Sequence, residues 1–124
     1  MDIAINAIQQ QGDHTKEYVI LYVKADCNIG EYLLTDDTFD RTGLPSNKHR
    51  HVFFFPDMAV KAGEYLVLWT KVGKYKEGKT TDGATAHYFY WNLKEAVWND
   101  AGDCAHLLKA PATQRQKMRV SASK

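Results

Sequence analysis

The densest group of side chains that could bind a metal or a phosphate is Lys48-His49-Arg50-His51. On a strand, residues two positions apart share one face, so His49 and His51 could bind one metal ion together. Carboxylates that could complete such a site lie upstream: Asp36, Asp37 and Asp40. No cysteine pair or His-Glu-x-x-His spacing accompanies them. We therefore favour a solvated loop that enters a strand, and we assign neither a metal nor a cofactor to the chain.

A second group is basic and surrounds one aromatic residue, Tyr75. Its cations lie between residues 71 and 83: Lys71, Lys74, Lys76 and Lys79. Further cations follow towards the C-terminus: Lys109, Arg115, Lys117, Arg119 and Lys124. Together they could bind the phosphates of a nucleic acid while Tyr75 stacks on a base. A solvated loop and an edge strand protected by charge explain the same residues, and we favour that interpretation.

A third feature is the aromatic run Ala86 to Trp91, with Trp98 following it. A row of exposed rings on a sheet could stack on sugars, as in carbohydrate-binding domains. The alternative is a core strand with two aromatic faces: His87, Phe89 and Trp91 on one, Tyr88 and Tyr90 on the other. Because aromatic residues dominate protein cores, we favour the core strand.

Residues for catalysis are sparse. The adjacent acids Asp36 and Asp37 would point to opposite sides of a strand, and acids such as Asp100 and Asp103 are common in turns. Cys104 and His106 would share one face of a strand, so a Cys–His nucleophile is formally possible. A cysteine within a strand is typically buried and inert, however. We predict no catalytic residue and no enzymatic activity.

Two neighbouring runs, Tyr18 to Val23 and Tyr32 to Leu34, anchor the predicted fold, since β-branched and aromatic residues fill both and turn residues bound them. The first run has two apolar faces: Val19, Leu21 and Val23 on one, Tyr18, Ile20 and Tyr22 on the other. A strand with two such faces is expected in the middle of a sheet with something covering each side.

Other runs predict further strands, with turn residues between them. We place them at residues 2–8, 51–55, 64–70, 85–91 and 104–109, with a last edge strand at 116–121 before a frayed tail. Two long connections, 36–50 and 71–83, interrupt them, and residues 93–98 form a short helix or a turn. Seven or eight short strands without a long helix indicate a β-sandwich or barrel.

The totals fit one globular domain of 124 residues, with 44% hydrophobic and 25% charged residues. The net charge is +1, although residues 1–62 carry more acids than bases and residues 63–124 the reverse. Cys27 and Cys104 are too few for a disulfide framework, and we expect two free thiols. The N-terminus lacks a signal-peptide pattern, and no apolar run approaches the roughly 20 residues of a membrane span. We expect a soluble, intracellular protein.

Three segments, in this order, resemble the lamin-tail domain family: EYVILYVKADCNIGEYLLTDD, FFFPDMAVKAGEYLVLWT and WNDAGDCAHLLKA. The positions that carry the resemblance are Glu17, Tyr18, Val19, Leu34, Asp36, Phe55, Pro56, Gly63 to Val67, Gly102, Asp103, Leu107 and Leu108. The resemblance implies an immunoglobulin-like β-sandwich of seven to eight strands. It also implies a module that binds or tethers proteins, and in some relatives DNA, and that is not an enzyme.

The sequence therefore predicts a single all-β domain that binds another macromolecule, most simply a protein, through its two long loops. The candidate binding residues are Lys48, His49, Arg50, Lys71, Lys74, Tyr75, Lys76 and Lys79. Nucleic-acid binding through the basic second half is the first alternative. A metal-dependent hydrolase, with His49 and His51 as ligands, or a carbohydrate-binding domain is the second. The oligomeric state stays open.

Overall fold

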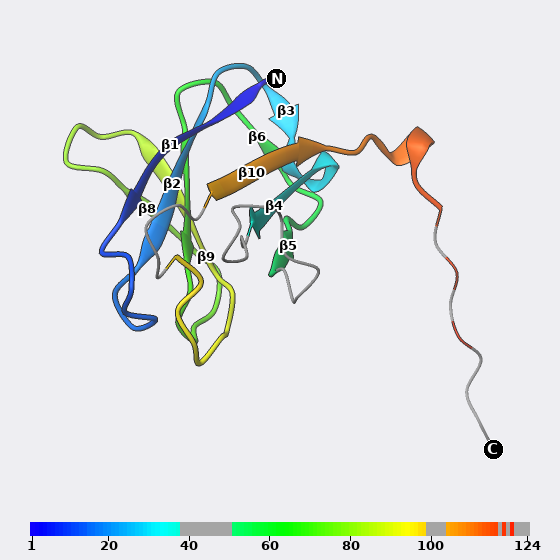
Figure 1. Cartoon of the computed structure of the whole chain (residues 1–124). Coiled ribbons are helices and arrows are strands. Elements are labelled where there is room, and N and C mark those ends of the chain that lie inside the picture. The colour runs from blue at the N-terminus through cyan, green and yellow to red at the C-terminus, as the bar shows by residue number, and fades with distance from the viewer. Residues whose placement is uncertain (38–50, 99–103, 117, 119, 121–124) are drawn as a thin grey trace.

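The computed structural model describes residues 1–37, 51–98, 104–116, 118 and 120 of the chain (Figure 1). The strands in these residues are β1 (Ile3–Gln9), β2 (Tyr18–Val23), β3 (Cys27–Asn28), β4 (Tyr32–Asp37), β5 (Val52–Phe54), β6 (Ala59–Val60), β7 (Tyr65–Trp69), β8 (Lys76–Lys79), β9 (Thr85–Tyr90) and β10 (Cys104–Lys109). The helical pieces of the same residues are two short 3₁₀ turns, η1 (Ile29–Glu31) and η2 (Ala112–Gln114). The protein is all-β, as the sequence predicts.

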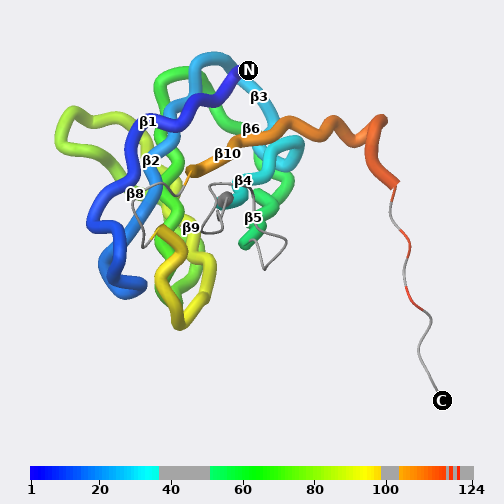
Figure 2. The backbone as a smooth tube through the Cα atoms, in the orientation of Figure 1, coloured from blue at the N-terminus to red at the C-terminus, as the bar shows by residue number. Residues whose placement is uncertain are grey.

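The strands form three sheets, the largest of which has five strands in the order β1-β2-β7-β9-β8. A three-stranded sheet has the order β10-β4-β5, and β3 pairs with β6. The pairing of β7 with β9 is parallel, whereas every other pairing of the described strands is antiparallel. The backbone trace shows β4, β5 and β10 lying across one side of the large sheet (Figure 2). Strand β2 lies inside the large sheet, which confirms its predicted position.

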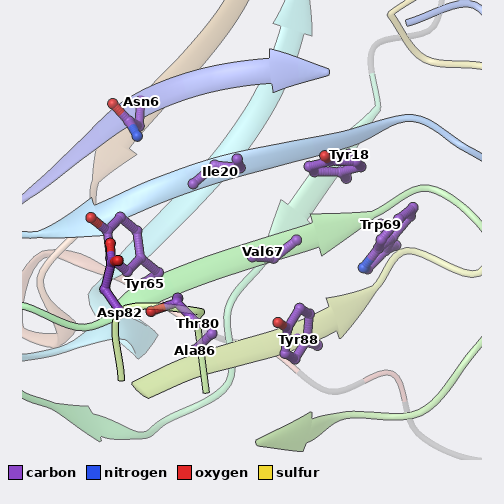
Figure 3. Close-up of a pocket in the computed structure, with 10 residues that line it drawn as sticks. All are labelled: Asn6, Tyr18, Ile20, Tyr65, Val67, Trp69, Thr80, Asp82, Ala86 and Tyr88. Carbon is purple, nitrogen blue, oxygen red and sulfur yellow. The ribbon is translucent and has the colours of Figure 1, made fainter. Parts of the chain in front are cut away.

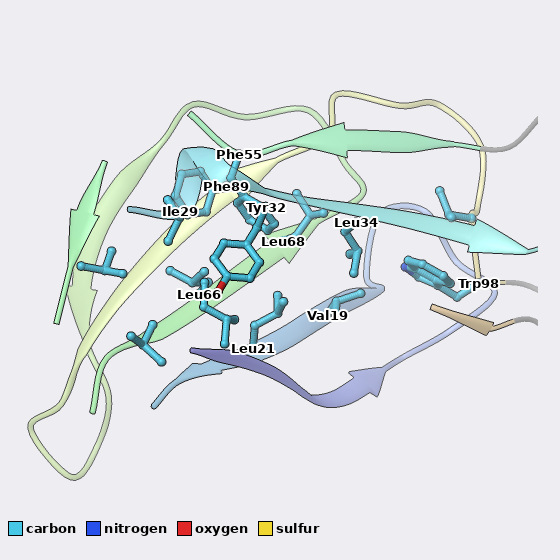
Figure 4. Packing of buried hydrophobic residues seen from close by; sticks show 14 residues of the cluster. Val19, Leu21, Ile29, Tyr32, Leu34, Phe55, Leu66, Leu68, Phe89 and Trp98 are labelled. Carbon is cyan, nitrogen blue, oxygen red and sulfur yellow. The ribbon is translucent and has the colours of Figure 1, made fainter. Parts of the chain in front are cut away.

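The core lies between the large sheet and the three-stranded sheet (Figure 4). Alternate residues of β2, β7 and β9 point into it: Val19, Leu21, Val23, Leu66, Leu68 and Phe89. From the other side Tyr32 and Leu34 of β4 meet them, together with Phe55 just after β5. Val19, Leu21 and Val23 have no exposed surface, so the predicted core face of β2 is confirmed.

One end of the core is closed by a buried carboxylate, that of Glu17, which has no exposed surface. Its Oε2 accepts hydrogen bonds from Thr70 Oγ1 at 2.6 Å, Val97 N at 2.8 Å and Trp98 N at 3.4 Å. Its Oε1 accepts a hydrogen bond from Gly12 N at 3.1 Å. The carboxylate thereby joins the β1–β2 connection, the end of β7 and the segment that follows β9. These contacts hold Val97 and Trp98 in the core.

Several predicted elements need correction. The connection predicted at 71–83 contains an edge strand, β8, whose sequence Lys-Glu-Gly-Lys has no apolar alternation by which it could be recognised. Residues 93–98 form bends, so of the two predicted alternatives, a short helix or a turn, the helix is wrong. The described residues of the predicted strand 116–121 are Gln116, Met118 and Val120, and they lie exposed outside any strand. None of these three side chains is buried, so none of them holds a strand against the core.

Candidate functional site

The face of the large sheet opposite the core carries six aromatic rings, which we call the aromatic face: Tyr18, Tyr22, Tyr65, Trp69, Tyr88 and Tyr90. Strand alternation puts them there, because their neighbours in β2, β7 and β9 point into the core. Tyr22 is 37% exposed, and the other five rings are partly buried. The expectation that both faces of β2 are covered is therefore wrong for the described part of the chain. The outer face remains partly open to solvent.

The strand register arranges the aromatic face in rows across the sheet. Tyr18, Trp69 and Tyr90 form one row. Ile20, Val67 and Tyr88 form the next, and Tyr22, Tyr65 and Ala86 form the third. Ile20, Val67 and Ala86 are smaller than the rings around them. The face is therefore hollowed at its centre.

A groove of about 400 Å³ occupies this centre (Figure 3). Ile20, Val67 and Ala86 line it together with the rings of Tyr18, Tyr65, Trp69 and Tyr88. Its polar lining comes from three further residues: Asn6, Thr80 and Asp82. Ligand sites in proteins are commonly concave and apolar, with a few polar groups that fix orientation. The groove fits that description.

The rings are packed against one another and are partly covered by lysines. The ring centroids of Tyr18 and Trp69 lie 4.5 Å apart, with an angle of 43° between the planes. The ammonium of Lys71 lies 4.3 Å from the Trp69 ring centre, and that of Lys76 lies 5.7 Å from the Tyr88 ring centre. Two of the predicted binding residues therefore border the aromatic face.

A second hollow of about 390 Å³ adjoins the groove along β8. Three rings of the aromatic face line it with lysines and one acid: Trp69, Tyr88, Tyr90, Lys71, Lys76, Lys79 and Glu77. Lys74 is exposed on the connection before β8. The basic part of the site thus lies beside the groove and is separate from its polar lining.

Two glycines make room for the outer rings. A Cβ at Gly73 would overlap the ring of Tyr90, and a Cβ at Gly78 would lie 3.0 Å from Cε2 of Tyr88. The backbone N–H of Gly73 donates a hydrogen bond to Asn92 Oδ1 at 2.9 Å, which fixes the connection before β8 against the strand end. Both rings therefore lie flat beside backbone, where a larger residue would push them out.

Tyr75 lies away from the aromatic face, on the core side of the sheet edge. Its hydroxyl is 2.8 Å from Nδ1 of His87, and the two rings stack with an angle of 16°. Burial and the nearby carboxylates of Glu77 and Glu64 raise the pKa of Tyr75, so the phenol stays neutral. Although Tyr75 is 44% exposed, one side of its ring is already occupied by protein. It is a poorer platform for a base than the sequence suggests.

His87 links Tyr75 to Glu64. Its Nε2 lies 3.0 Å from Glu64 Oε1, which also accepts a hydrogen bond from the backbone N–H of Lys61 at 3.0 Å. Burial acts to raise the pKa of Glu64, but the hydrogen bonds from Lys61 and His87 outweigh it, and the pKa lies below its ordinary value. The chain Tyr75–His87–Glu64 fastens the 71–75 connection to the sheet.

The predicted metal and phosphate group lies mostly beyond the described residues, which exclude Lys48, His49 and Arg50. His51 is described, and its backbone N–H donates a hydrogen bond to Asp36 Oδ1 at 2.6 Å. Its Nδ1 lies 3.3 Å from Asp36 Oδ2, and this carboxylate is buried. The pair ties β4 to the start of β5. Within the described ranges no group of three His, Cys, Asp or Glu side chains is placed to hold a metal.

The cysteine prediction needs one correction. Cys104 begins β10 and is exposed, as is His106, so Cys104 is not the buried mid-strand residue that the sequence suggests. Cys27 is a partly buried free thiol, so the two cysteines are not bridged, as predicted. Burial, and then the charge of Asp2, raise the pKa of Cys27. The exposure of Cys104 removes burial as a reason against a Cys104–His106 nucleophile, and the lack of a catalytic residue stays a prediction.

The remaining predicted cations are not gathered on the aromatic face. Arg115 donates hydrogen bonds to the backbone carbonyls of Gly30 and Ala110. The ammonium of Lys109 lies 5.9 Å from the ring centre of Tyr32, which faces the core side of β4. Lys117, Arg119 and Lys124 lie outside the described residues. Of the predicted basic residues, Lys71, Lys76 and Lys79 are brought together.

Comparison with known proteins adds no assignment: no family model matches the sequence, and a search among curated proteins finds no relative. Among the described residues, no helix has the length and apolar character to cross a bilayer. The geometry of the aromatic face is therefore the basis for a function.

Proposed function

We propose that the protein is a non-enzymatic interaction module of immunoglobulin-like, lamin-tail type that binds another macromolecule, with the aromatic face as its contact surface. The observation that carries the proposal is the set of six partly exposed rings around one groove. Large aromatic residues with a polar tip are enriched in recognition surfaces, because they bury much area at small entropic cost. Contiguous apolar patches of this kind are uncommon on monomeric proteins unless they bind something.

The lining of the groove favours holding a ligand over converting one. It offers rings, one amide, one aliphatic hydroxyl and one carboxylate. Catalysis by side chains generally needs a nucleophile next to a base, or paired carboxylates. Asp82 lies among Asn6, Thr80 and aromatic residues, and this arrangement supplies hydrogen bonds and stacking.

The proposal moves the main contact from the two predicted loops to the sheet. The connection 71–83 still contributes, since Lys71 and Lys76 lie over rings of the aromatic face. The part of the connection 36–50 that carries Lys48, His49 and Arg50 lies outside the described residues, so its role stays a prediction. For these two connections, the protein partner that the sequence predicts stays a prediction.

Nucleic-acid binding is a second candidate because lysines and rings alternate in the hollow along β8. Lys71, Lys76 and Lys79 line it with Trp69, Tyr88 and Tyr90. Binding of this kind combines phosphate contacts with stacking of bases on aromatic rings. Its affinity for a single strand would fall steeply as salt concentration rises.

A matched pair of variants tests the proposal. Trp69→Ala removes a ring from the groove, whereas Phe54→Ala removes a ring that is 60% exposed on strand β5 of the three-stranded sheet. Both variants and the unchanged protein are screened against arrays of proteins, glycans and nucleic acids. We expect ligands that the Trp69→Ala variant loses and the Phe54→Ala variant keeps. Equal binding by all three proteins would refute the aromatic face as the contact surface.

A further inference from the structure

The groove on the aromatic face has two chemically different ends. Figure 3 shows Tyr18, Trp69 and Tyr88 around one end, and Asn6, Tyr65, Thr80 and Asp82 around the other. Ile20 and Val67 lie between them. A ligand that fills the groove must therefore stack on rings at one end and exchange hydrogen bonds at the other.

Two polar groups at the hydrogen-bonding end are available to a ligand. Within the described part of the chain, neither the Asn6 amide nor the Asp82 carboxylate makes a hydrogen bond. Asn6 lies at a β-bulge, where the register of β1 against β2 shifts between Ile5 and Ala7. Bulges often redirect a side chain at a functional site, and here the bulged residue lines the groove.

The third polar group, the Thr80 hydroxyl, can still donate a hydrogen bond. Thr80 Oγ1 accepts a hydrogen bond from the backbone N–H of Ala84 at 3.1 Å, which leaves its hydroxyl hydrogen to donate. The polar end thus offers an amide, a hydroxyl donor and a carboxylate acceptor. Sugar hydroxyls donate and accept with equal ease, so they can satisfy all three groups together.

The charge of the groove lining favours a neutral ligand over an anionic one. Among the residues that the structure describes, its lining includes no lysine or arginine, and the one carboxylate is that of Asp82. A phosphate or sulfate placed there would be repelled by Asp82 and would lack a cation. Lys71 and Lys76 lie at its rim, over the rings of Trp69 and Tyr88. A neutral chain therefore fits the groove itself better than a nucleic acid does.

The rings suit a pyranose better than an extended flat surface. The face of a pyranose carries C–H bonds with partial positive charge, which pack on the negative face of an aromatic ring. The Tyr18 and Trp69 planes are inclined by 43°, so they cannot lie together against one flat crystalline surface. A single soluble chain, whose successive units twist, can meet both rings.

We propose that the groove binds a short stretch of a neutral oligosaccharide or polysaccharide chain. One sugar stacks at the Trp69 end, and hydroxyls of the chain bond to Asp82, Asn6 and Thr80. This proposal rests on the function proposed above, because it names the ligand class of the same aromatic face. The volume of about 400 Å³ lies at the small end of ligand sites, consistent with a short stretch of chain.

The test is affinity electrophoresis in native gels that contain soluble neutral polysaccharides: hydroxyethyl cellulose, laminarin, arabinoxylan and galactomannan. Heparin and poly(dT) serve as anionic probes in parallel gels. We expect at least one neutral polysaccharide to retard the protein. Trp69→Ala should weaken that binding by about tenfold or more, since stacking and burial of one ring contribute over one kilocalorie per mole.

A second variant, at an exposed residue, distinguishes a loss of binding from a folding defect. Asp82→Asn changes an exposed side chain of the groove, and we expect a loss of about threefold to tenfold, a typical effect of one weakened hydrogen bond. Phe54→Ala and Glu95→Gln change an exposed ring and an exposed acid that do not line the groove, and both should bind as the unchanged protein does. Circular dichroism confirms that each variant is folded.

The outcomes separate the two proposals. Retardation by no neutral polysaccharide, or retardation that Trp69→Ala and Asp82→Asn leave unchanged, overturns the neutral-chain proposal. If heparin or poly(dT) binds instead and Trp69→Ala abolishes that binding, the aromatic face remains the contact surface and the neutral chain is wrong. If Trp69→Ala changes binding to no probe in these gels and to no protein, glycan or nucleic acid on the arrays, both proposals fail.

Discussion

Replacing Glu17 by alanine should be among the most damaging single changes in this chain. The carboxylate has no exposed surface and accepts four hydrogen bonds. Two of them are short, at 2.6 Å from Thr70 Oγ1 and 2.8 Å from Val97 N. The alanine variant removes all four and leaves the buried N–H groups of Val97 and Trp98 without an acceptor.

The size of the effect follows from these donors. A buried donor left unsatisfied costs about 1–3 kcal/mol. The Thr70 hydroxyl can rotate, and Gly12 is exposed, so water can reach its N–H group. Counting mainly Val97 and Trp98, we expect Glu17→Ala to lower the free energy of unfolding by about 3–5 kcal/mol. Glu17→Gln keeps one acceptor oxygen, which can take the place of Oε2, so we expect a loss of about 1–2 kcal/mol.

Urea unfolding followed by tryptophan fluorescence measures both variants. Trp98 is 2% exposed and its backbone bonds to Glu17, so its emission reports the site directly. Glu95→Ala changes an exposed acid in the same segment and should stay within about 0.5 kcal/mol of the unchanged protein. The reasoning is refuted if Glu17→Ala costs less than about 1 kcal/mol, or if the glutamine variant costs as much as the alanine one.

Two further predictions concern the surroundings of the aromatic face. Gly73→Ala should lower the free energy of unfolding by about 1–3 kcal/mol, because the new methyl group overlaps the Tyr90 ring and displaces it. Thermal unfolding measures this effect. An unchanged melting temperature would contradict it and would show that the ring moves at no cost. Glu64 should add pH-dependent stability: because its pKa is lower in the folded protein, its contribution is complete above the ordinary value of 4.5 and is lost as the pH falls through the folded pKa. Melting temperatures recorded between about pH 6 and pH 3 should fall more steeply for the unchanged protein than for Glu64→Gln, and parallel curves would contradict the hydrogen-bond account.

The core could be predicted from the sequence, because one face of residues 18–23 and 65–69 is entirely aliphatic while the other is mainly aromatic. Strand β8 could not, since Lys76–Lys79 has no apolar residue and forms only by pairing with β9. The burial of Glu17 could not be predicted from its neighbours in the sequence. A glutamate before a strand is ordinarily solvated, and its burial depends on donors at Thr70 and Val97, which lie 53 and 80 residues further along the chain.

The candidate site was only partly predictable. The sequence predicts Lys71, Lys76 and Lys79 as binding residues, and they lie together beside the rings. The sequence does not single out Tyr18 and Trp69 as site residues, because an aromatic strand face has the same pattern whether it is buried or exposed. The number of rings is the feature of the sequence that points to them, since the outer positions of β2, β7 and β9 include six aromatic residues. The sequence alone shows no second layer that would cover so many.

The openness of this face itself argues for recognition. The inner face of the large sheet already provides the core, with Val19, Leu21, Leu66 and Leu68 almost fully buried. The outer positions would fold equally well with threonine or lysine, which are favoured on solvated sheets and protect against aggregation. Rings that stay partly exposed gain less from burial than core residues do, so stability of the fold is a weak reason to hold six of them on one face. A ligand that covers them supplies the missing reason, and loss of binding in Trp69→Ala without a matching loss of stability would establish it.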